Sequence, residues 1–421
     1  MLNHYAQHPG GAGGTRHFSL ARYLPQYGWE ASVIAASIDP VSGEDRLENA
    51  PDRASLLQTY SGVPFMWLRV SRYSGNGLSR IRNMIEYGLA VLRSNALKSL
   101  PRPDAVIGST VHPLAAWAGL RLARRHKVPF IFEVRDLWPQ TLIDMGRIGA
   151  RHPLAIALRM LERHLFRNAA RVIVLGRRTG EYMVDTGGSK DRVVWIPNGA
   201  DLELYSSAGA ATQSNSAGHQ LFYIGAHGNA NDLENLIRAM RIVQESPRGA
   251  GIMLNMVGDG PLRPSLIALA EELGLDNVRF RAPVPKASVP SLLAEADSCV
   301  ICVRDLPRLY RFGISMNKIF DYMAAAKPIV MSANVPDNPV IDGGAGICVP
   351  PEDPAALAAG ILNMAALSVD QRMAMGEAGR RHLEAEYSMK ALSARLAEAL
   401  DASVASNDWR EPPGKLSIRR M

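Results

Sequence analysis

Cysteine is scarce in this chain of 421 residues, which has only Cys299, Cys302 and Cys348. Three cysteines cannot form the disulfide framework of a small secreted protein, and their scarcity favours the cytoplasm. Cys299 and Cys302 have C-x-x-C spacing, but they lie in the apolar stretch ADSCVICV with no second pair. We therefore interpret both as core residues rather than as metal ligands or a redox pair.

Long apolar runs are absent too. No run reaches 18 residues, which argues against a membrane-spanning helix, and the N-terminus lacks the basic and apolar segments of a signal peptide. The sequence contains no H-E-x-x-H, no P-loop, no G-x-S-x-G and no metal-ligand spacing. These absences argue against the metalloprotease, P-loop and serine-hydrolase classes.

Charge is unevenly distributed. Residues 1–200 contain 26 Lys and Arg against 15 Asp and Glu, and the remainder contains 21 against 25. A basic first half indicates an anionic partner, either nucleic acid or an anionic membrane surface. The chain lacks a helix-turn-helix, a zinc site and a basic pattern interleaved with aromatics, so we expect no nucleic acid.

Short apolar runs alternate with helical patterns along the whole sequence. Such runs are typical of parallel strands buried on both faces, and the alternation predicts an α/β, doubly wound fold. The predicted strands are 31–36, 104–109, 130–134, 171–175 and 193–197 in the first half, and 221–225, 252–258, 277–281, 299–303, 328–331 and 346–350 in the second.

Turn-rich residues 197–201 (PNGAD) separate the two arrays and predict a boundary there. We expect a first domain at 1–197, a second at 198–386, a helix at 387–402 that packs toward the first domain, and a disordered tail at 403–421. Two further segments are expected to be irregular: 42–80, as a mobile loop, and 206–218, as a flexible surface loop.

The segment Gly313–Val330, GISMNKIFDYMAAAKPIV, reads as a helix start followed by a strand. Ser315 is a suitable N-cap, and Lys318 falls in the first helical turn, where a cation is unfavourable unless an anion binds. Asn317, Lys318 and Asp321 can share one helix face. This pattern suggests a phosphate site with an acid for sugar hydroxyls; an ordinary amphipathic helix is the alternative.

Several loops that follow predicted strands carry further candidates, because ligands bind at the carboxyl ends of parallel strands. The glycine loop 10–16 precedes a helix, and His112 and Arg135 follow the second and third strands. A tight turn, a structural histidine and a buried ion pair of Arg135 with Asp136 or Glu133 are the respective alternatives. The second half offers the loops 225–232 and 258–261, with Arg304, Arg308 and Arg311 preceding the helix that begins in the segment 313–330.

Eight of these segments, in this order, resemble the retaining glycosyltransferases of family four, which have the GT-B fold. The likeness covers about residues 1–402 and is greatest to the bacterial fucosamine-transferase-like branch, which builds O-antigen and capsule. The segments are NHYAQHPGGAGGTRHFSLARYLPQYGW, FEVRDLWPQ, RVIVLGRRTGEYM, VVWIPNGADLE, FYIGAHGNANDLENLI, VGDGPLRPSL, NVRFRAPVPKASVP and GISMNKIFDYMAAAKPIV.

The resemblance implies two Rossmann-like domains that face each other across a cleft, with the acceptor in the first and a nucleotide sugar in the second. Asp321 matches the acid that holds the ribose, and Arg135 stands where many members have a catalytic-pocket histidine. The implied catalytic residues are Arg135, Lys318 and His112. The implied donor-binding residues are Gly13, Gly14, Gly225, Asn231, Gly258, Asp259, Pro283, Val284, Arg311, Ser315, Asn317, Lys318 and Asp321.

Three departures from the family pattern stand out. The first acid of the paired-acid motif falls on Gly313, and Ala226 and Asn231 replace the usual phosphate-binding Arg and Lys. The usual first strand has little sequence before Asn3, so this strand is either very short or begins upstream. Lys318, with one of the nearby arginines, is expected to supply the missing positive charge.

The implied activity is transfer of a sugar, with an N-acetylated deoxyhexosamine as one candidate, from a UDP-linked donor with retention of configuration. The implied acceptor is an undecaprenyl-diphosphate-linked glycan at the cytoplasmic face of the plasma membrane, where the basic first half would dock on anionic lipid. No metal or other cofactor is expected, because cationic side chains would stabilise the leaving diphosphate. A nucleotide-sugar 2-epimerase and an inactive donor-binding subunit are the alternatives.

Overall fold

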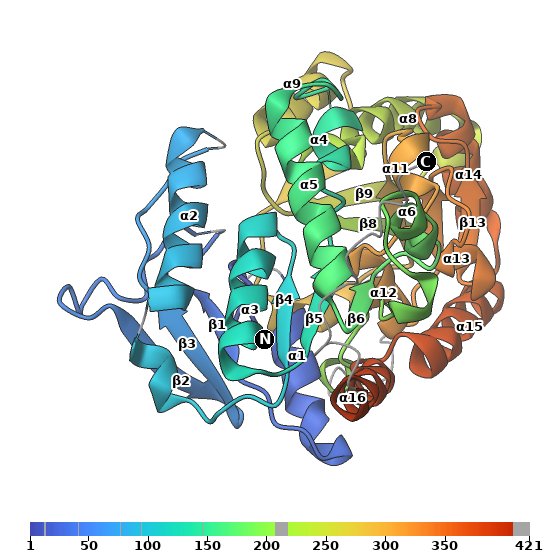
Figure 1. Cartoon of the computed structure of the whole chain (residues 1–421). Helices are drawn as coiled ribbons and strands as arrows, with labels where there is room; N and C mark the ends of the chain where they lie inside the picture. The colour runs from blue at the N-terminus through green and yellow to red at the C-terminus, as the bar shows by residue number, and fades with distance from the viewer. Residues whose placement is uncertain are drawn as a thin grey trace, which may run out of the picture. The chain divides into compact units, whose positions relative to one another are not determined.

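A computed structural model describes residues 1–11, 14–40, 42–75, 77–93, 95–144, 146–206 and 218–406. The chain forms two compact units (Figure 1). The first contains Met1–Pro197 and the C-terminal segment that begins at Leu392, and the second contains Asn198–Ala391. Each is a largely parallel sheet covered by helices, as expected for strands that are apolar on both faces.

The first unit contains seven named strands among its described residues. Their spatial order is β2-β3-β1 and β4-β5-β6-β7, and only β2 runs antiparallel to its neighbour. The strands are β1 (Val33–Ala36), β2 (Ser55–Tyr60), β3 (Val63–Leu68), β4 (Val106–Ser109), β5 (Phe130–Val134), β6 (Arg171–Val174) and β7 (Val193–Trp195).

A single residue, Leu2, joins the two parts of this sheet. It forms parallel bridges with both Ile34 and Gly108, and its N–H donates to the carbonyl oxygen of Ile107 at 2.8 Å. Leu2 therefore occupies the position of a central strand between β1 and β4.

The prediction of an irregular loop over 42–80 is wrong. Residues 55–68 form a hairpin of β2 and β3 with a turn at Ser61 and Gly62, which both have positive φ (45° and 83°). That geometry is typical of a two-residue hairpin turn. The alternating Val63, Phe65 and Trp67 are buried in a core cluster, a strand pattern overlooked among the neighbouring polar residues.

Helices cover both faces of the sheet of the first unit. On one face α2 packs against α3, and α3 packs against α5 and the strands β4 and β5 (Figure 1). The helical segments are α1 (Arg16–Tyr23), η1 (Leu24–Tyr27), α2 (Leu78–Arg93), η2 (Asn95–Ser99), α3 (Pro113–His126), α4 (Gln140–Asp144), α5 (Pro153–Asn168), α6 (Thr179–Asp185), η3 (Lys190–Arg192) and α16 (Met389–Ala405).

The second unit has a fully parallel sheet of six strands in the order β10-β9-β8-β11-β12-β13. Every predicted strand of this half is present. The strands are β8 (His219–Ile224), β9 (Ile252–Val257), β10 (Val278–Arg281), β11 (Ser298–Cys302), β12 (Ile329–Ser332) and β13 (Gly346–Val349).

The helices of the second unit alternate with these strands, as the sequence predicts. They are α7 (Glu203–Ser206), η4 (Asn229–Asn231), α8 (Leu233–Glu245), η5 (Pro247–Gly249), α9 (Arg263–Glu272), η6 (Lys286–Ser288), α10 (Val289–Ala294), α11 (Pro307–Tyr310), α12 (Asn317–Ala324), α13 (Pro339–Asp342), α14 (Pro354–Ala366) and α15 (Val369–Glu386). Cys299 and Cys302 of β11 are fully buried, and burial raises the pKa of both thiols, so they are core residues as predicted.

The predicted C-terminal helix is present but longer than expected. Helix α16 continues to Ala405, because Leu392, Leu396 and Leu400 bury a continuous apolar stripe. Residues 407–421 of the predicted tail and 207–217 of the predicted flexible loop lie outside the described residues. Within the ranges that the structure describes, no helix is long and apolar enough to cross a membrane.

Candidate active site

The side chain of Lys318 lies at the centre of the candidate site in the second unit. Helix α12 begins at Asn317, so Lys318 occupies its first turn as predicted. Its Nζ donates to the hydroxyl of Tyr223 at 2.7 Å and to Oδ1 of Asn231 at 2.9 Å, and lies 4.2 Å from the centroid of the Tyr223 ring. None of the ion pairs among the described residues includes Lys318. Burial lowers the pKa of this ammonium to about 7.

Glycines at the carboxyl ends of β8 and β9 bring the backbone close to this lysine. Gly225 has φ of 153°, and a Cβ there would lie 3.2 Å from Nζ of Lys318. Gly258 has φ of 145°, and a Cβ there would lie 2.0 Å from the carbonyl oxygen of Gly225. Only glycine fits at both positions, so the two loops form a compact backbone surface beside a buried cation.

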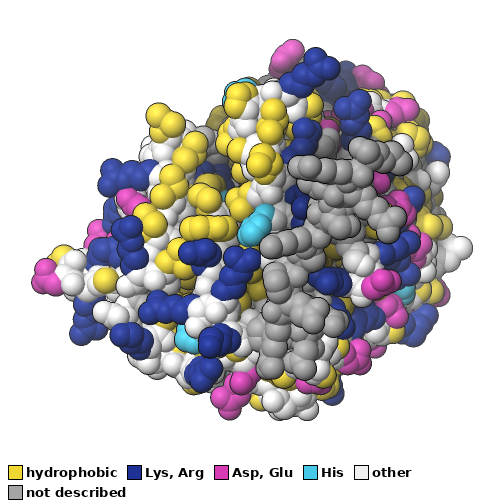
Figure 2. Space-filling model, viewed as in Figure 1, with side chains coloured by type: hydrophobic (Ala, Val, Ile, Leu, Met, Phe, Trp, Pro, Cys, Tyr) yellow, Lys and Arg dark blue, Asp and Glu magenta, His cyan; other side chains and the backbone are white. Residues whose placement is uncertain are grey.

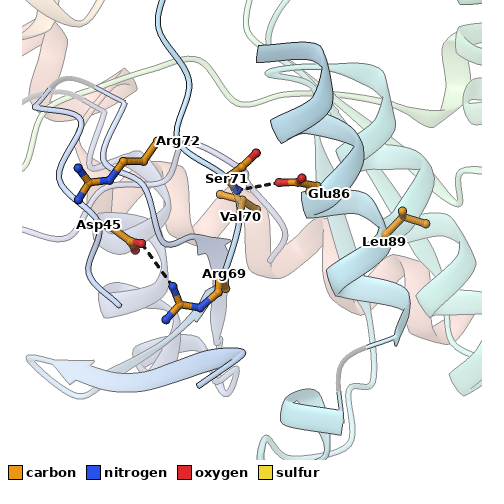
Figure 3. Close-up of a pocket in the computed structure, with 7 residues that line it drawn as sticks. All are labelled: Asp45, Arg69, Val70, Ser71, Arg72, Glu86 and Leu89. Carbon is orange, nitrogen blue, oxygen red and sulfur yellow. Dashed lines mark hydrogen bonds and ion pairs between the residues drawn. The ribbon is translucent and has the colours of Figure 1, made fainter. Parts of the chain in front are cut away.

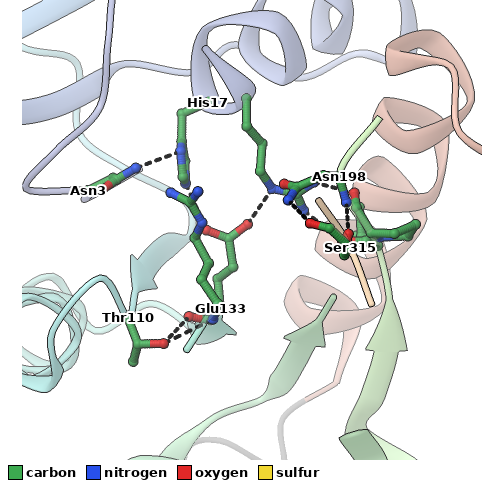
Figure 4. A network of polar contacts seen from close by, with 10 residues as sticks. Asn3, His17, Thr110, Glu133, Asn198 and Ser315 are labelled. Atoms are coloured by element: carbon green, nitrogen blue, oxygen red, sulfur yellow. Dashed lines mark hydrogen bonds and ion pairs between the residues drawn. The ribbon is translucent and has the colours of Figure 1, made fainter. Parts of the chain in front are cut away.

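Ser315 does not cap helix α12, contrary to the prediction. The N-cap is Met316, and it makes no capping hydrogen bond through its side chain. The Ser315 hydroxyl instead accepts from the backbone N–H of Asn198 at 2.8 Å, and the Asn198 amide donates to the Ser315 carbonyl oxygen at 2.6 Å (Figure 4). The hydroxyl was expected to accept from the free N–H groups at the start of α12, but it accepts instead from Asn198, a residue distant in sequence.

Asp321 lies on the same helix as Lys318 but contacts different groups. Its carboxylate is buried, accepts from the Tyr205 hydroxyl at 2.8 Å and forms an ion pair with Nζ of Lys286. Asn317 is exposed. Lys318 and Asp321, expected to share one face of α12, therefore contact two different sets of partners. Sequence reasoning missed Tyr205 and Lys286, although Lys286 stands in one of the segments that resemble the family and Tyr205 lies two residues after another.

His227 is a second residue that sequence reasoning missed. It is fully buried, and neither ring nitrogen has a hydrogen-bond partner among the residues that the structure describes. Its ring centroid lies 5.9 Å from that of Tyr223 and 6.4 Å from that of Phe280. Burial lowers its pKa to about 4, so at neutral pH the ring is uncharged. It contacts aromatic rings from two strands, Tyr223 of β8 and Phe280 of β10.

The remaining predicted donor residues lie around these loops. Oδ1 of Asp259 accepts from the N–H of Gly260 at 2.7 Å, which stabilises the turn after β9. Pro283 is exposed and Val284 is half-buried, both just after β10. The Arg311 guanidinium stacks on the ring of Phe312, 4.4 Å from its centroid.

In the first unit, Glu133 at the end of β5 anchors a buried polar network (Figure 4). Oε1 of Glu133 accepts from Nε of Arg16 at 2.9 Å, and Oε2 accepts from Nε2 of His17 at 2.8 Å. The other ring nitrogen of His17 accepts from the Asn3 amide at 2.9 Å. The alternative that Glu133 pairs with Arg135 is therefore wrong. Burial alone would raise the pKa of Glu133, but His17 and Arg16 hold it well below its usual range.

Arg135 lies just beyond this network. Its backbone N–H donates to Oγ1 of Thr110 at 3.0 Å, and its Nε is buried with no hydrogen-bond partner in the described part of the chain. A Cβ on Gly14 would lie 3.8 Å from a terminal nitrogen of Arg135. The structure thus brings the Gly14 backbone and the Arg135 guanidinium together, as an anion or sugar site requires. Gly13 lies outside the described residues.

Both ring nitrogens of His112 are engaged. As N-cap of α3, its Nδ1 accepts from the N–H of Ala115 at 3.3 Å, and its Nε2 is hydrogen-bonded to Nδ1 of His4 at 2.6 Å. Burial lowers the pKa of His112 to about 3. This geometry favours the structural alternative over a catalytic role.

Comparison with known proteins gives matches for both units. Residues 11–199 match the family described as "Glycosyl transferase 4-like domain", and residues 218–366 match "Glycosyl transferases group 1". The chain is 26% identical to the probable glycosyltransferase WbjE of Pseudomonas aeruginosa over 73% of its own length and 77% of that protein. It is 24% identical to the putative colanic acid biosynthesis glycosyl transferase WcaI of Escherichia coli K12, over 62% and 66%.

Solved structures show the same fold at low identity. Sucrose-phosphate synthase from Thermosynechococcus elongatus has a TM-score of 0.69 at 19% identity, covering 94% of this chain and 96% of that one. Anabaena HepE in complex with UDP and glucose has a TM-score of 0.66 at 16% identity, covering 95% and 98%. Because the two family matches and this shared fold agree, the chain belongs to the GT-B glycosyltransferases. Its first domain is a glycosyl transferase 4-like domain, and its second domain is of the glycosyl transferases group 1 type.

Proposed function

We propose that this glycosyltransferase transfers a sugar from a UDP-linked donor to a lipid-linked glycan, with retention of the anomeric configuration, in the synthesis of a cell-surface polysaccharide. The observation that carries the proposal is the half-buried Lys318 ammonium, which has neutral hydrogen-bond partners and, among the described residues, no carboxylate partner. A cation in the first turn of a helix is stabilised when an anion binds there. The donor diphosphate is such an anion.

In the proposed reaction, the bond between the anomeric carbon and the diphosphate oxygen breaks while a bond to the acceptor oxygen forms on the same face. The acceptor proton passes to the departing phosphate oxygen. The diphosphate gains negative charge as it leaves, and Lys318 and the first amides of α12 stabilise that charge. The proposal assigns no step to a metal or another cofactor.

Asp321 is the proposed ribose-binding acid. Its carboxylate is engaged by Lys286 and Tyr205, so ribose hydroxyls would have to displace or share these donors. Related structures of HepE from Anabaena and of TarM from Staphylococcus aureus are complexes with UDP. These ligands support UDP as the first nucleotide to test.

The proposed acceptor, an undecaprenyl-diphosphate-linked glycan, places the enzyme at the cytoplasmic face of the membrane. The basic first half supports this, but some of its arginines are neutralised by acids. Arg69 lies 3.6 Å from Asp45, and Arg72 lies 2.8 Å from Glu48. Arg69 and Arg72 line a hollow of about 590 Å³ together with Glu86 and Leu89. Figure 3 shows these side chains. Charge attraction by these arginines is therefore weaker than their number suggests.

An inactive donor-binding subunit is the second candidate, favoured by Gly313 in place of an acid and by the occupied Asp321 carboxylate. The 2-epimerase alternative gains nothing from the comparisons, whose curated relatives are named as glycosyltransferases.

A thermal-shift screen of the full chain with UDP, GDP and dTDP tests the proposal, because a ligand that binds the folded state raises the midpoint. We expect the largest shift with UDP. Release of sugar from a radiolabelled UDP-sugar, with or without a lipid acceptor, then separates the enzyme from an inactive subunit. The proposed function is refuted if no nucleotide shifts the midpoint.

A further inference from the structure

Helix α2 has two apolar faces, one toward the protein and one toward solvent. Tyr87 and Val91 are buried. On the opposite side, Leu78, Ile81, Ile85 and Leu89 have exposed fractions of 82%, 48%, 46% and 37%. At 3.6 residues per turn these four side chains fall within an arc of about 80° on the helix surface. A surface helix normally has a single apolar stripe, so the outer stripe requires a partner.

Helix α5 has a similar outward-facing group. Leu154, Ile156 and Met160 in its first half have exposed fractions of 46%, 49% and 69%. Helix α3 lies between α2 and α5, so the three form one layer of the first unit. Figure 2 shows hydrophobic side chains gathered over α2 and α5, with Lys and Arg side chains beside them.

The layer is strongly basic. Helices α2, α3 and α5 together contain nine arginines and two glutamates. One glutamate, Glu86, is paired with Arg82, and the other, Glu162, is buried and accepts from the Tyr182 hydroxyl. The surface therefore combines exposed apolar side chains with an excess of positive charge.

The apolar residues also lie at the end of the unit where chemistry is expected. Helices that follow parallel strands begin at the carboxyl edge of the sheet. The exposed apolar groups of α2 and α5 start at the first or second residue of each helix, Leu78 and Leu154, and extend along it from there. Arg135 and Gly14 lie at the same edge of the sheet. A surface attached here would bring its own groups to the proposed acceptor site.

We propose that the outer face of α2, together with the first half of α5, inserts into the interfacial region of an anionic lipid bilayer. Helices that lie in a membrane interface combine one apolar face with flanking Lys and Arg. Charge complementarity favours anionic lipid over a protein partner or a second copy of this basic surface, which would repel its own arginines. The inference rests on the proposed function in one respect: the apolar face of α2 and α5 is the surface through which the enzyme would reach a lipid-linked acceptor.

The test uses the full chain and vesicles of phosphatidylethanolamine and phosphatidylglycerol, with phosphatidylcholine vesicles for comparison. The variant combines Ile81→Ser and Ile85→Ser. Its control combines Val369→Ser and Met373→Ser on α15, whose side chains are equally exposed at 46% and 49%. The α15 helix contains three arginines and four acids besides, so it lacks the basic excess.

We expect the wild type and the control to co-sediment with the anionic vesicles, and the α2 variant to partition on the order of a hundredfold less. Ile85→Cys labelled with a polarity-sensitive dye in a Cys348→Ser background should shift to the blue on vesicle addition, and Met373→Cys should not. Equal binding of the α2 variant and the wild type, or no binding by either, overturns the inference. A wild-type dimer that the α2 variant dissociates, seen by light scattering, would also overturn it, because the face would then be a self-association surface.

Nucleotide binding separates this inference from the proposed function. The α2 variant should keep the full thermal shift with UDP, which shows that it is folded. If the shift is present and vesicle binding is absent in the wild type, only the membrane inference fails. If vesicle binding depends on α2 and no nucleotide binds, only the proposed function fails.

Discussion

Replacing Lys318 with methionine should stabilise the donor-free protein while weakening its affinity for a nucleoside diphosphate. Methionine has nearly the length of lysine but no charge. The pKa of Lys318 is lowered by burial from 10.5 to about 7, so the folded protein holds this proton poorly. At about 1.4 kcal/mol per pKa unit, burying this lysine costs roughly 4 kcal/mol at neutral pH.

Removing the lysine relieves that cost, but part of the gain in the free energy of unfolding is lost again in the Lys318→Met variant. The Tyr223 hydroxyl keeps its own hydrogen bond to the carbonyl oxygen of Ala226, but Oδ1 of Asn231 loses its donor. An unsatisfied buried acceptor costs about 1–3 kcal/mol. The net expectation is a gain of about 1–3 kcal/mol, or a rise of several degrees in the unfolding midpoint of a unit of this size.

The pH dependence has a definite sign. Between pH 7 and pH 10.5 the unfolded chain binds a proton at Lys318 that the folded chain does not, so this residue makes stability rise with pH across that window. The advantage of the Lys318→Met variant should therefore be largest near pH 7 and shrink toward pH 10.5.

Differential scanning fluorimetry from pH 7 to pH 10, with and without UDP, measures both effects. The loss of a charged donor to phosphate, about 1.5–3 kcal/mol, should weaken UDP binding at least tenfold. The reasoning is refuted if Lys318→Met lowers the midpoint at pH 7 by several degrees, or if its UDP affinity equals that of the wild type.

Three further predictions follow from close contacts. Gly258→Ala should lower the free energy of unfolding by more than about 3 kcal/mol, because its Cβ would lie 2.0 Å from a backbone oxygen. Gly228→Ala in the neighbouring loop is the control: its Cβ would have nothing nearer than 3.9 Å, so it should be nearly neutral in urea unfolding. Glu133→Gln should destabilise the first unit by about 3–5 kcal/mol, since it leaves a buried guanidinium unpaired; an unchanged urea midpoint would contradict this. Asp321→Asn should weaken UDP binding about tenfold in calorimetry, and unchanged affinity would exclude the ribose role.

The fold was largely readable from local patterns. The strand FIFEV at 130–134 appears with the predicted bounds, and the other predicted strands agree to within two residues at either end. Strands buried on both faces give unbroken apolar runs, a signal that does not depend on distant contacts. The hairpin at 55–68 was missed because its alternation is short and its outer face is polar.

Partner choice in the candidate site was not readable in the same way. Ser315 was predicted to cap its own helix, but Asn198, 117 residues away, takes its hydroxyl. Asp321 meets Lys286 and Tyr205, and Glu133 meets Arg16 rather than Arg135. Each pairing joins segments far apart in sequence, so no local pattern could have indicated it.

The sequence by itself determined that two doubly wound units exist, and that Lys318 lies in the first turn of a helix between two strands. Periodicity and turn chemistry act over a few residues, which is why they are legible without a structure. Only the tertiary structure decided that this ammonium meets no carboxylate among the described residues, that Gly225 and Gly258 approach it, and that the second apolar face of α2 is exposed. Burial and pairing are properties of the packed chain, because they depend on which distant segments meet.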